Sequence, residues 1–349
     1  MSVAHQLQAV PAPGIDRLWY TRCNVPTASG IAFNLGWLAD RYGRDGMTIG
    51  ALQDAPLEIA RHHYDHLLPG LIREGGNVPA LVARSNGAPT RLIGLTWIDE
   101  QQIIAVRPES GIAGPRDLAG RRIAVPAFTG RGETSMARAM ALHGFENALA
   151  LAGLTLADVE IIDVGLEEIV PPGRHRKSTQ AVLWPGLDLV EQGAADALYL
   201  KGAAAGRAAR AAGLVVAVDL DATPDRRSRV NNGTPRPLTV HEDLLAQHPD
   251  WVVAFLAETL RAADWAAADA HAVKEIVARE TQAPVEEMEK TYGPDFHATL
   301  HPDLSGERLG LLGIQKDFLL RHGFLARDFD LADWVEPGPL QAARRLLEG

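Results

Sequence analysis

Three side chains in the first quarter of the sequence form a set that could act on a small oxyanion. Cys23 lies in TRCNVP, His63 in RHHYDH and Arg73 in LIREGG. A thiolate is a nucleophile, an imidazole transfers protons near neutral pH, and a guanidinium offers a planar fork of donors that fits two oxygens of an anion. Together they favour a site that holds an anion and either attacks it or protonates it.

Cys23 is the single cysteine of the chain, so the sequence allows no internal disulfide and no cysteine zinc cluster. The local pattern indicates a strand, a turn and then a helix. The amide dipoles at the start of a helix favour a thiolate, which is the reactive form. The alternative interpretation is a small buried apolar side chain.

Gly75 and Gly76 follow Arg73 closely. Glycines let a backbone approach a ligand and present its N–H groups without obstruction. We therefore expect Gly75 and Gly76 to assist Arg73 in binding an anion. The alternative is a turn that carries a surface arginine, since this motif is short and common.

His62, His63 and His66 raise the possibility of a metal site, but only His62 and His66 have the i,i+4 spacing of one helix face. An acid of the HExxH type is missing, so we predict no metal. A solvated polar face or local hydrogen bonding is the favoured interpretation of the cluster. The loop at 128–135, FTGRGETS, could hold an anion on free N–H groups or only cap a helix.

Short apolar runs alternate with alanine-rich helical stretches, which predicts α/β layers. Strands are expected at 92–95, 103–106, 122–125, 159–163 and 214–218. Helices are expected at 134–143, 203–212, 248–270, 283–292, 308–321 and 339–347.

Two polar, proline-containing stretches, at 105–117 and 219–237, are predicted to be crossings between lobes. The first lobe would comprise residues 1–106 and 220–349 and would carry the cysteine, histidine and arginine. The inserted second lobe would comprise residues 107–219. A ligand is then expected in the cleft between them.

Composition narrows the classes of partner. The chain has 34 Lys plus Arg against 44 Asp plus Glu, a net charge of −10, so we expect no nucleic acid and no anionic membrane as partner. Its apolar runs fall short of the roughly 20 residues that span a bilayer. A start without a basic segment and apolar core predicts a cytoplasmic protein.

Several motifs together resemble the 2'-hydroxybiphenyl-2-sulfinate desulfinase family. They are YTRCNVP around Cys23, the block from His63 to Gly76, TRLIGLT at 90–96, DLAGRRIAV at 117–125 and DALY at 196–199. In that family the reactive cysteine has a Y-x-x-C-x-V-P context, and a functional histidine precedes the arginine by ten positions. Here that position is His63.

The resemblance implies a type II periplasmic-binding-protein-like fold, with two α/β lobes, two crossover segments and a helical C-terminal part. The implied activity is hydrolysis of the carbon–sulfur bond of an aryl sulfinate, which releases sulfite without a cofactor. The implied catalytic residues are Cys23 as nucleophile or proton donor, His63, and Arg73. The substrate is a small anionic organosulfur compound, and the oligomeric state is left open, a monomer included.

The expected substrate-binding residues are Thr21, Tyr64, Gly75, Gly76, Phe128, Trp184 and Tyr199. The three aromatic candidates in the second half of this set would supply an aryl pocket. Tyr64 stands where the family member has phenylalanine, and the segment LQDAPLEIA at 52–60 resembles an insertion.

Two further functions stay open. Segments such as DLAGRRIAVP and PLTVHEDLLAQHP also resemble sulfonate- and nitrate-type binding proteins, which bind their solutes without catalysis. Another thiol-dependent hydrolase on the same fold is the other alternative. A relative of the thiamin-pyrimidine synthases is disfavoured, because that family carries a cysteine-rich segment.

Overall fold

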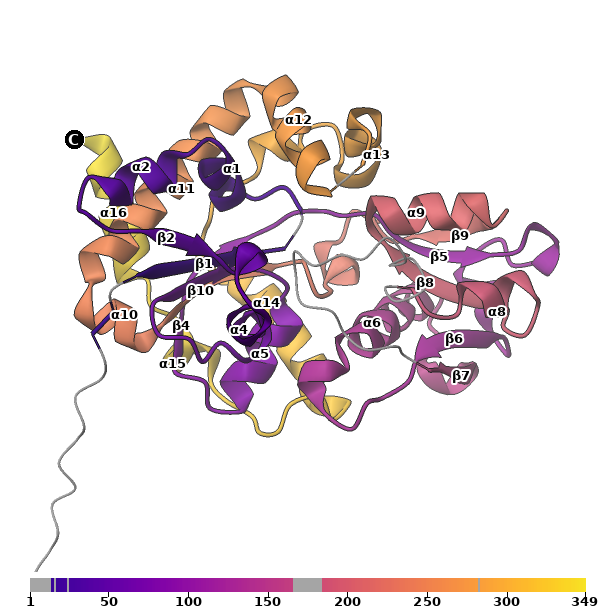
Figure 1. The fold of residues 1–349 in the computed structure, drawn as a ribbon. Coiled ribbons are helices and arrows are strands. Elements are labelled where there is room, and N and C mark those ends of the chain that lie inside the picture. Colours follow the sequence, from indigo (N-terminus) through magenta and orange to yellow (C-terminus); the bar gives the residue numbers. More distant parts are fainter. Residues whose placement is uncertain (1–13, 16, 24, 166–183, 282) are drawn as a thin grey trace, which may run out of the picture.

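The computed structural model describes residues 14–15, 17–23, 25–165, 184–281 and 283–349. It contains two lobes, each built on a five-stranded sheet (Figure 1). The strand orders are β2-β1-β3-β10-β4 and β7-β6-β8-β5-β9. In each sheet one strand, β10 or β5, runs antiparallel to its neighbours.

The strands of the first sheet are β1 (Leu18–Arg22), β2 (Ile49–Ala51), β3 (Leu71–Glu74), β4 (Thr90–Thr96) and β10 (Arg236–His241). Those of the second are β5 (Gln102–Val106), β6 (Arg122–Pro126), β7 (Glu160–Val164), β8 (Ala197–Lys201) and β9 (Val215–Asp219).

The helices of the first half are α1 (Ala28–Asn34), α2 (Trp37–Gly43), α3 (Leu57–Ala60), α4 (His62–Asp65), α5 (Asn77–Ser85) and α6 (Met136–Ala150). Those of the second half are α8 (Leu187–Glu191), α9 (Gly202–Ala211), α10 (Glu242–Gln247), α11 (Pro249–Ala268), α12 (Ala270–Thr281), α13 (Met288–Tyr292), α14 (Gly306–Arg321), α15 (Leu331–Trp334) and α16 (Gly338–Glu348).

Apolar side chains place these helices on the sheets. One core lies between the first sheet and α1, α2, α11, α12 and α16. A second core joins the lobes, because it contains side chains of α5 and β4 together with β5, β6, α6 and α14. A third fills the far face of the second sheet, under α8 and α9.

The chain crosses between the sheets at 97–101, from β4 to β5, and at 220–235, from β9 to β10. The second crossing agrees with the predicted one. The first lies earlier than the predicted 105–117, because the apolar run IIAV pairs with β8 and β9 and so belongs to the second sheet. The lobe boundaries drawn from the sequence stay predictions. The boundary drawn at residue 106 would assign β5 to the first lobe, whereas β5 belongs to the second sheet.

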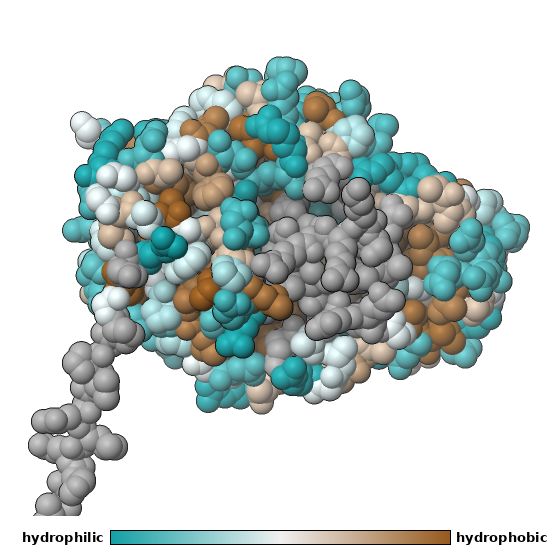
Figure 2. Space-filling view, viewed as in Figure 1, coloured by the Kyte–Doolittle hydropathy of each residue, from teal (hydrophilic) through white to brown (hydrophobic). Residues whose placement is uncertain are grey.

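All five strands predicted from apolar runs are present, as β4, β5, β6, β7 and β9. The helix predicted at 283–292 is shorter, since α13 begins at Met288. On the face drawn in Figure 2, polar residues spread over both lobes and apolar residues form separate patches. No described helix is long and apolar enough to cross a membrane.

Candidate active site

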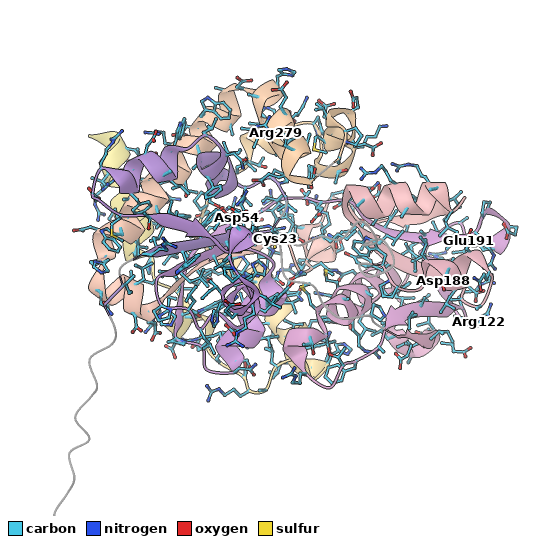
Figure 3. The ribbon with its side chains drawn as sticks, viewed as in Figure 1. Cys23, Asp54, Arg122, Asp188, Glu191 and Arg279 are labelled. Atoms are coloured by element: carbon cyan, nitrogen blue, oxygen red, sulfur yellow. The ribbon has the colours of Figure 1, made fainter. Side chains whose placement is uncertain are left out.

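The carboxyl ends of two neighbouring parallel strands form the centre of the site. β1 and β3 pair with Thr21 opposite Arg73, and the N–H of Cys23 extends the ladder by donating to the Glu74 carbonyl at 3.2 Å. Because side chains alternate along a strand, Thr21 and Arg73 point to one face and Glu74 to the other. Figure 3 shows Cys23 at the inner end of the first lobe, near Asp54.

The thiol of Cys23 lies at the start of a helix, although not of the helix that follows it in sequence. The N–H of Gly76 donates to Cys23 Sγ at 3.4 Å, and Gly76 directly precedes α5. The side chain is partly buried. A donor N–H at a helix start is the kind of surrounding that stabilises a thiolate. The helix start beside the thiol is therefore that of α5 instead of α1.

Arg73 lies in the interior with its guanidinium bonded to protein groups. Nε donates to the His63 carbonyl at 2.8 Å, Nη1 donates to the Gly76 carbonyl at 3.1 Å, and Nη2 lies 3.5 Å from His63 Nε2. Burial lowers the pKa of Arg73 to about 10, against the opposing effect of the Cys23 charge. The terminal nitrogens carry four N–H groups in all, so two remain for a ligand.

His63 is held between Arg73 and Thr21. Its Nδ1 lies 2.9 Å from Thr21 Oγ1. Because a guanidinium can only donate, His63 Nε2 must be the acceptor and Nδ1 must carry the proton given to Thr21. Burial, followed by the charge of Arg73, lowers the pKa of His63 well below 6.5. The imidazole is therefore neutral at neutral pH, and Thr21 is bonded to His63.

The two glycines make room for side chains of the protein. A Cβ on Gly75 would lie 2.6 Å from the Arg73 Cζ, and one on Gly76 would lie 2.4 Å from the Asn232 Oδ1. The N–H of Gly75 donates to the Pro237 carbonyl at 3.2 Å. This differs from the predicted role, since the N–H of Gly75 is used within the sheet and that of Gly76 by Cys23.

Two side chains of the α4 region border this network. The Tyr64 ring stands edge-on to His63 with centroids 5.1 Å apart. Burial, assisted by the nearby Cys23 charge, raises the pKa of Tyr64 to about 12. His66 ends α4 in the left-handed region, with φ 58°, and is buried with both ring nitrogens unpartnered among the described residues. Burial and the Arg73 charge lower the pKa of His66 well below 6.5.

Glu74 is a buried acid on the opposite face of β3. Its carboxyl accepts hydrogen bonds from Ser29 and from Thr96, the latter at 2.9 Å. Burial raises its pKa, and this effect outweighs the hydrogen bonds. No motif of the sequence indicates a role for Glu74, because an acidic residue before two glycines is typical of a turn.

The three aromatic candidates lie elsewhere. Trp184 and Tyr199 line one cavity of about 10 Å³, room for one water. The Tyr199 hydroxyl donates to Gln102 Oε1 at 2.8 Å inside the core. Phe128, 45% exposed, packs edge-on against Phe324 at 5.8 Å. In the described part of the chain, no ring contact or hydrogen bond joins these three rings to Cys23.

The loop at 128–135 closes on itself, since the N–H of Thr129 donates to Ser135 Oγ at 3.1 Å and Ser135 Oγ donates to the Arg131 carbonyl at 2.6 Å. Among the described residues no group of three or more His, Cys, Asp or Glu side chains is arranged to hold a metal ion. His62 is hydrogen-bonded instead, since its Nδ1 lies 2.6 Å from Asp65 Oδ1.

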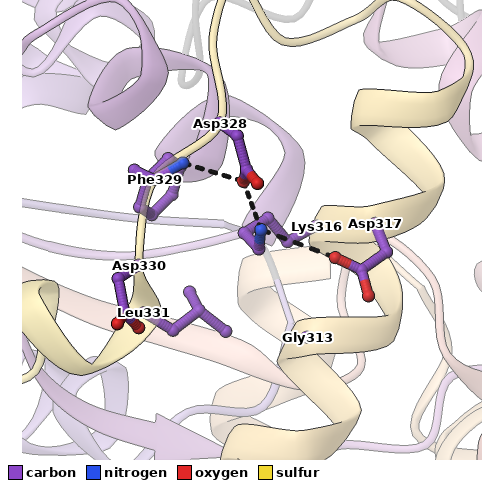
Figure 4. A pocket seen from close by; sticks show the side chains of 7 residues that line it. All are labelled: Gly313, Lys316, Asp317, Asp328, Phe329, Asp330 and Leu331. Carbon is purple, nitrogen blue, oxygen red and sulfur yellow. Dashed lines mark hydrogen bonds and ion pairs between the residues drawn. The ribbon is translucent and has the colours of Figure 1, made fainter.

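A surface hollow of about 560 Å³ lies away from this centre, between α14 and the segment before α15. In Figure 4, Lys316 of α14 is paired with Asp328 on the opposite wall and with Asp317, its neighbour in α14. Its one cation is thus paired within the protein, and the hollow contains none of the predicted site residues. Its lining residues are Gly313, Lys316, Asp317, Asp328, Phe329, Asp330 and Leu331.

Comparison with known proteins identifies a family and a relative of this chain. A family model described as NMT1/THI5 like matches residues 77–272. The 2'-hydroxybiphenyl-2-sulfinate desulfinase of Rhodococcus erythropolis is 29% identical, over 92% of each chain. The resemblance predicted from the motifs is confirmed.

Two solved structures extend the comparison. A cysteine-to-serine mutant of DSZB in complex with biphenyl-2-sulfinic acid is 25% identical, with a TM-score of 0.73 over 95% of this chain and 99% of that one. The periplasmic aliphatic sulphonate binding protein SsuA from Escherichia coli is 14% identical, with a TM-score of 0.66 over 93% of each chain. The predicted fold, with two α/β lobes of the type II periplasmic-binding-protein kind, is confirmed.

Proposed function

We propose that this chain, which belongs to the NMT1/THI5-like family, is a hydrolase that cleaves the carbon–sulfur bond of an aryl sulfinate and releases sulfite. One observation carries the proposal. Gly76 joins the thiol to the guanidinium, since its N–H donates to Cys23 and its carbonyl accepts from Arg73. The relative from R. erythropolis is a desulfinase by name, and the DSZB mutant binds a biphenyl sulfinate.

Arg73 binds the sulfinate in this scheme. A sulfinate has one charge on two oxygens, and the two N–H groups left on the terminal nitrogens of Arg73 offer a matching pair of donors. The hydrogen bonds to His63 and Gly76 hold the guanidinium in place before the substrate arrives. Preorganised donors of this kind contribute roughly 3–4 kcal/mol to stabilisation of a transition state.

Cys23 acts as the nucleophile. Its thiolate attacks the sulfinate sulfur, the carbon–sulfur bond breaks, and the ring carbon keeps the electron pair and takes up a proton. The resulting cysteine S-sulfinate reacts with water, which gives hydrogen sulfite and regenerates the thiol. Summed over both steps, one aryl sulfinate and one water give one arene and one hydrogen sulfite. No redox change and no further co-reactant is needed.

A second route gives the same products: the thiol protonates the ring carbon, and the SO₂ that leaves is hydrated to sulfite. The surroundings of the sulfur favour the first route, because Gly76 donates to Sγ and the Arg73 charge lies close by, and both stabilise a thiolate. In either route His63 positions Arg73, as a neutral ring whose tautomer is fixed by Thr21.

Tyr64 is proposed to lie beside the aryl group, since it borders both His63 and Cys23. Of the remaining aromatic candidates, Phe128 is the exposed one and so the one that a ligand can reach directly. Tyr199 and Trp184 would affect binding of the aryl group only indirectly, through the shape of the second lobe. Because the thiol must stay reduced to react, we propose that the protein works in the cytoplasm.

The test is sulfite release from a panel of aryl and alkyl sulfinates. We expect turnover by the wild type and loss of several orders of magnitude in Cys23→Ser, which removes the nucleophile but changes one atom. Arg73→Lys should also lose most activity, because an ammonium cannot supply the fork. A transient mass increase of one SO₂ on the wild type would support the nucleophilic route, and folded protein without turnover of any sulfinate would refute the proposal.

A binding protein without catalysis is the second candidate, favoured by the likeness of the fold to the sulphonate binding protein. Under this alternative, calorimetric titration would show that Cys23→Ser binds a sulfinate or sulfonate as the wild type does, and no arene would form.

A further inference from the structure

A second buried arginine lies close to the end of β3, at the start of β10. Arg236 is the first residue of β10 and is 2% exposed. β10 runs antiparallel to β3, and the Gly75 N–H donates to the carbonyl of the next residue, Pro237. The start of β10 therefore lies beside the end of β3, where Arg73 and the two glycines are.

Among the described residues two carboxyl groups, those of Glu100 and Glu74, lie within electrostatic range of Arg236, and neither is hydrogen-bonded to it. Its Nη2 lies 4.0 Å from Glu100 Oε2, and its Nε has no hydrogen-bond partner among the described residues. Glu100 binds a second cation more closely, since Lys201 Nζ lies 3.0 Å from the same oxygen. One carboxylate is thus shared by an ammonium and a guanidinium.

The charged groups of Lys201 and Arg236 lie close together. A Cβ built on Gly233 would lie 2.5 Å from Lys201 Nζ and 2.8 Å from Arg236 Nη2. The charge of Arg236 also lowers the pKa values of Arg73 and His63, which places it within electrostatic range of the anion site. Arg73 itself is hydrogen-bonded to carbonyl oxygens and an imidazole, and to no carboxylate of the described part of the chain.

Buried charges in proteins are normally paired, so a surplus of buried cations indicates an anionic ligand. We propose that Arg236 is a second anion-binding residue of this site, which together with Arg73 binds the sulfur oxyanion, and that Glu100 is the internal counter-ion that competes with it. The proposal rests on the proposed function for the identity of the anion, and names inorganic sulfite, its product, as the simplest ligand.

The experiment is calorimetric titration of the full chain with inorganic sulfite. Arg236→Met should weaken binding about tenfold or more, because a charge-assisted contact is lost. The matched control is Arg229→Met: Arg229 is a largely buried arginine of the same crossing, but Asp99 pairs with it at 3.0 Å. We expect this control to bind sulfite within about twofold of the wild type.

Glu100→Gln is expected to change the affinity for sulfite in the opposite direction. It keeps the proposal testable if the Arg236→Met protein fails to fold. Removal of the competing carboxylate should tighten sulfite binding by about threefold or more, which a purely structural role of Arg236 does not produce. Circular dichroism checks the fold of each variant. Unchanged affinity in a folded Arg236→Met protein, or unchanged or weaker affinity in Glu100→Gln, would overturn the proposal.

The outcome is separable from that of the proposed function. If sulfinates are not cleaved but the two variants shift sulfite binding in opposite directions, Arg236 is an anion-binding residue of a protein with another activity. If sulfinates are cleaved and Arg236→Met binds and turns over as the wild type does, the function stands and this inference fails.

Discussion

Gly75 shows how tightly the residues of the site fit one another. The position allows no side chain, because the guanidinium of Arg73 occupies the space where a Cβ would lie. That guanidinium cannot move aside freely, since the carbonyl oxygens of His63 and Gly76 hold it at two nitrogens. Gly75 therefore serves the proposed anion site indirectly, by leaving room for Arg73.

Gly75→Ala should therefore displace Arg73 and reduce kcat/KM for an aryl sulfinate by about 100-fold, at a folding cost of about 1–3 kcal/mol. Sulfite release and urea unfolding measure the two effects. Gly310→Ala in α14 is the matched control, because nothing lies within 4 Å of its added Cβ. Near-normal turnover by Gly75→Ala would show that Arg73 is not needed in its observed place.

Thr21 tests the tautomer of His63. Thr21→Val keeps the shape of the side chain but removes the acceptor for the Nδ1 proton, which leaves a buried donor unpaired at a cost of about 1–3 kcal/mol. We expect kcat/KM to fall about tenfold or more, because the ring is then free to turn away from Arg73.

The control for Thr21 is Thr259→Val in α11, a fully buried threonine whose hydroxyl donates to the Phe255 carbonyl at 2.8 Å. This variant should keep full activity. If both valine variants turn over aryl sulfinates equally well, the hydrogen bond to His63 has no part in the reaction.

At the level of residues, the sequence indicated Cys23, His63 and Arg73 because each stands in a recognisable local motif. The structure places the three in one hydrogen-bonded network. Arg236 and Glu100 were not found, since they lie in segments with the composition of linkers. The two residues are 136 positions apart in sequence and meet only through the path of the two crossings, which no local pattern encodes.

At the level of elements, one carboxylate joins the second crossing to the start of β5. Asp221, in the second crossing, accepts a hydrogen bond from the N–H of Gln102 at the start of β5, at 2.6 Å. Its other oxygen has no partner among the described residues. Burial raises the pKa of Asp221 to about 7, against the opposing hydrogen bond from Gln102.

The raised pKa of Asp221 determines how the stability of the protein changes with pH. Between the unfolded value of 3.8 and about 7, the native state binds a proton that the unfolded chain has lost, so stability falls as pH rises through this window. Asp221→Asn removes the effect and should raise the free energy of unfolding by about 2 kcal/mol at about pH 8, but much less at about pH 4.

Urea unfolding at both pH values measures this difference, and Asp188→Asn on the exposed surface of α8 is the control, which should change little at either pH. An Asp221→Asn protein less stable than the wild type at the higher pH would contradict the assignment.

The elements also explain which parts of the fold the sequence revealed. β4, β5, β6, β7 and β9 were predicted because each contains an apolar run. β3 was not, since its LIRE sequence places an arginine and a glutamate in the interior, where hydrogen bonds replace apolar contacts. β10 begins with Arg236 and Pro237 and reads as the end of a linker.

At the level of the whole molecule, imidazoles buried in both lobes contribute to the fall of stability in acid. His63 and His66 lie at the candidate active site, and their pKa values are well below 6.5 because of burial. His143 lies in the shared second core, stacked on Phe318 at 4.0 Å and bonded to Gln315 at 2.9 Å. Burial lowers its pKa to about 4.

Below pH 6.5 the unfolded chain therefore binds protons that the native state does not, so these histidines make stability fall as pH falls. Each contributes a slope of up to about 1.4 kcal/mol per pH unit. Asp221 and Glu74, whose pKa values burial raises, act in the opposite sense to these histidines.

His143→Gln should reduce the stability lost between about pH 8 and about pH 5 by about 1–2 kcal/mol, since one buried imidazole no longer has to be protonated on unfolding. Urea unfolding at both pH values gives the difference, which is independent of the stability that the substitution itself costs. His271→Gln is the control, because that side chain is 81% exposed and the native and unfolded states solvate it alike. An unchanged pH dependence in His143→Gln would mean that His143 is protonated in the native protein, and that the hydrogen bond to Gln315 stabilises an imidazolium in the shared core.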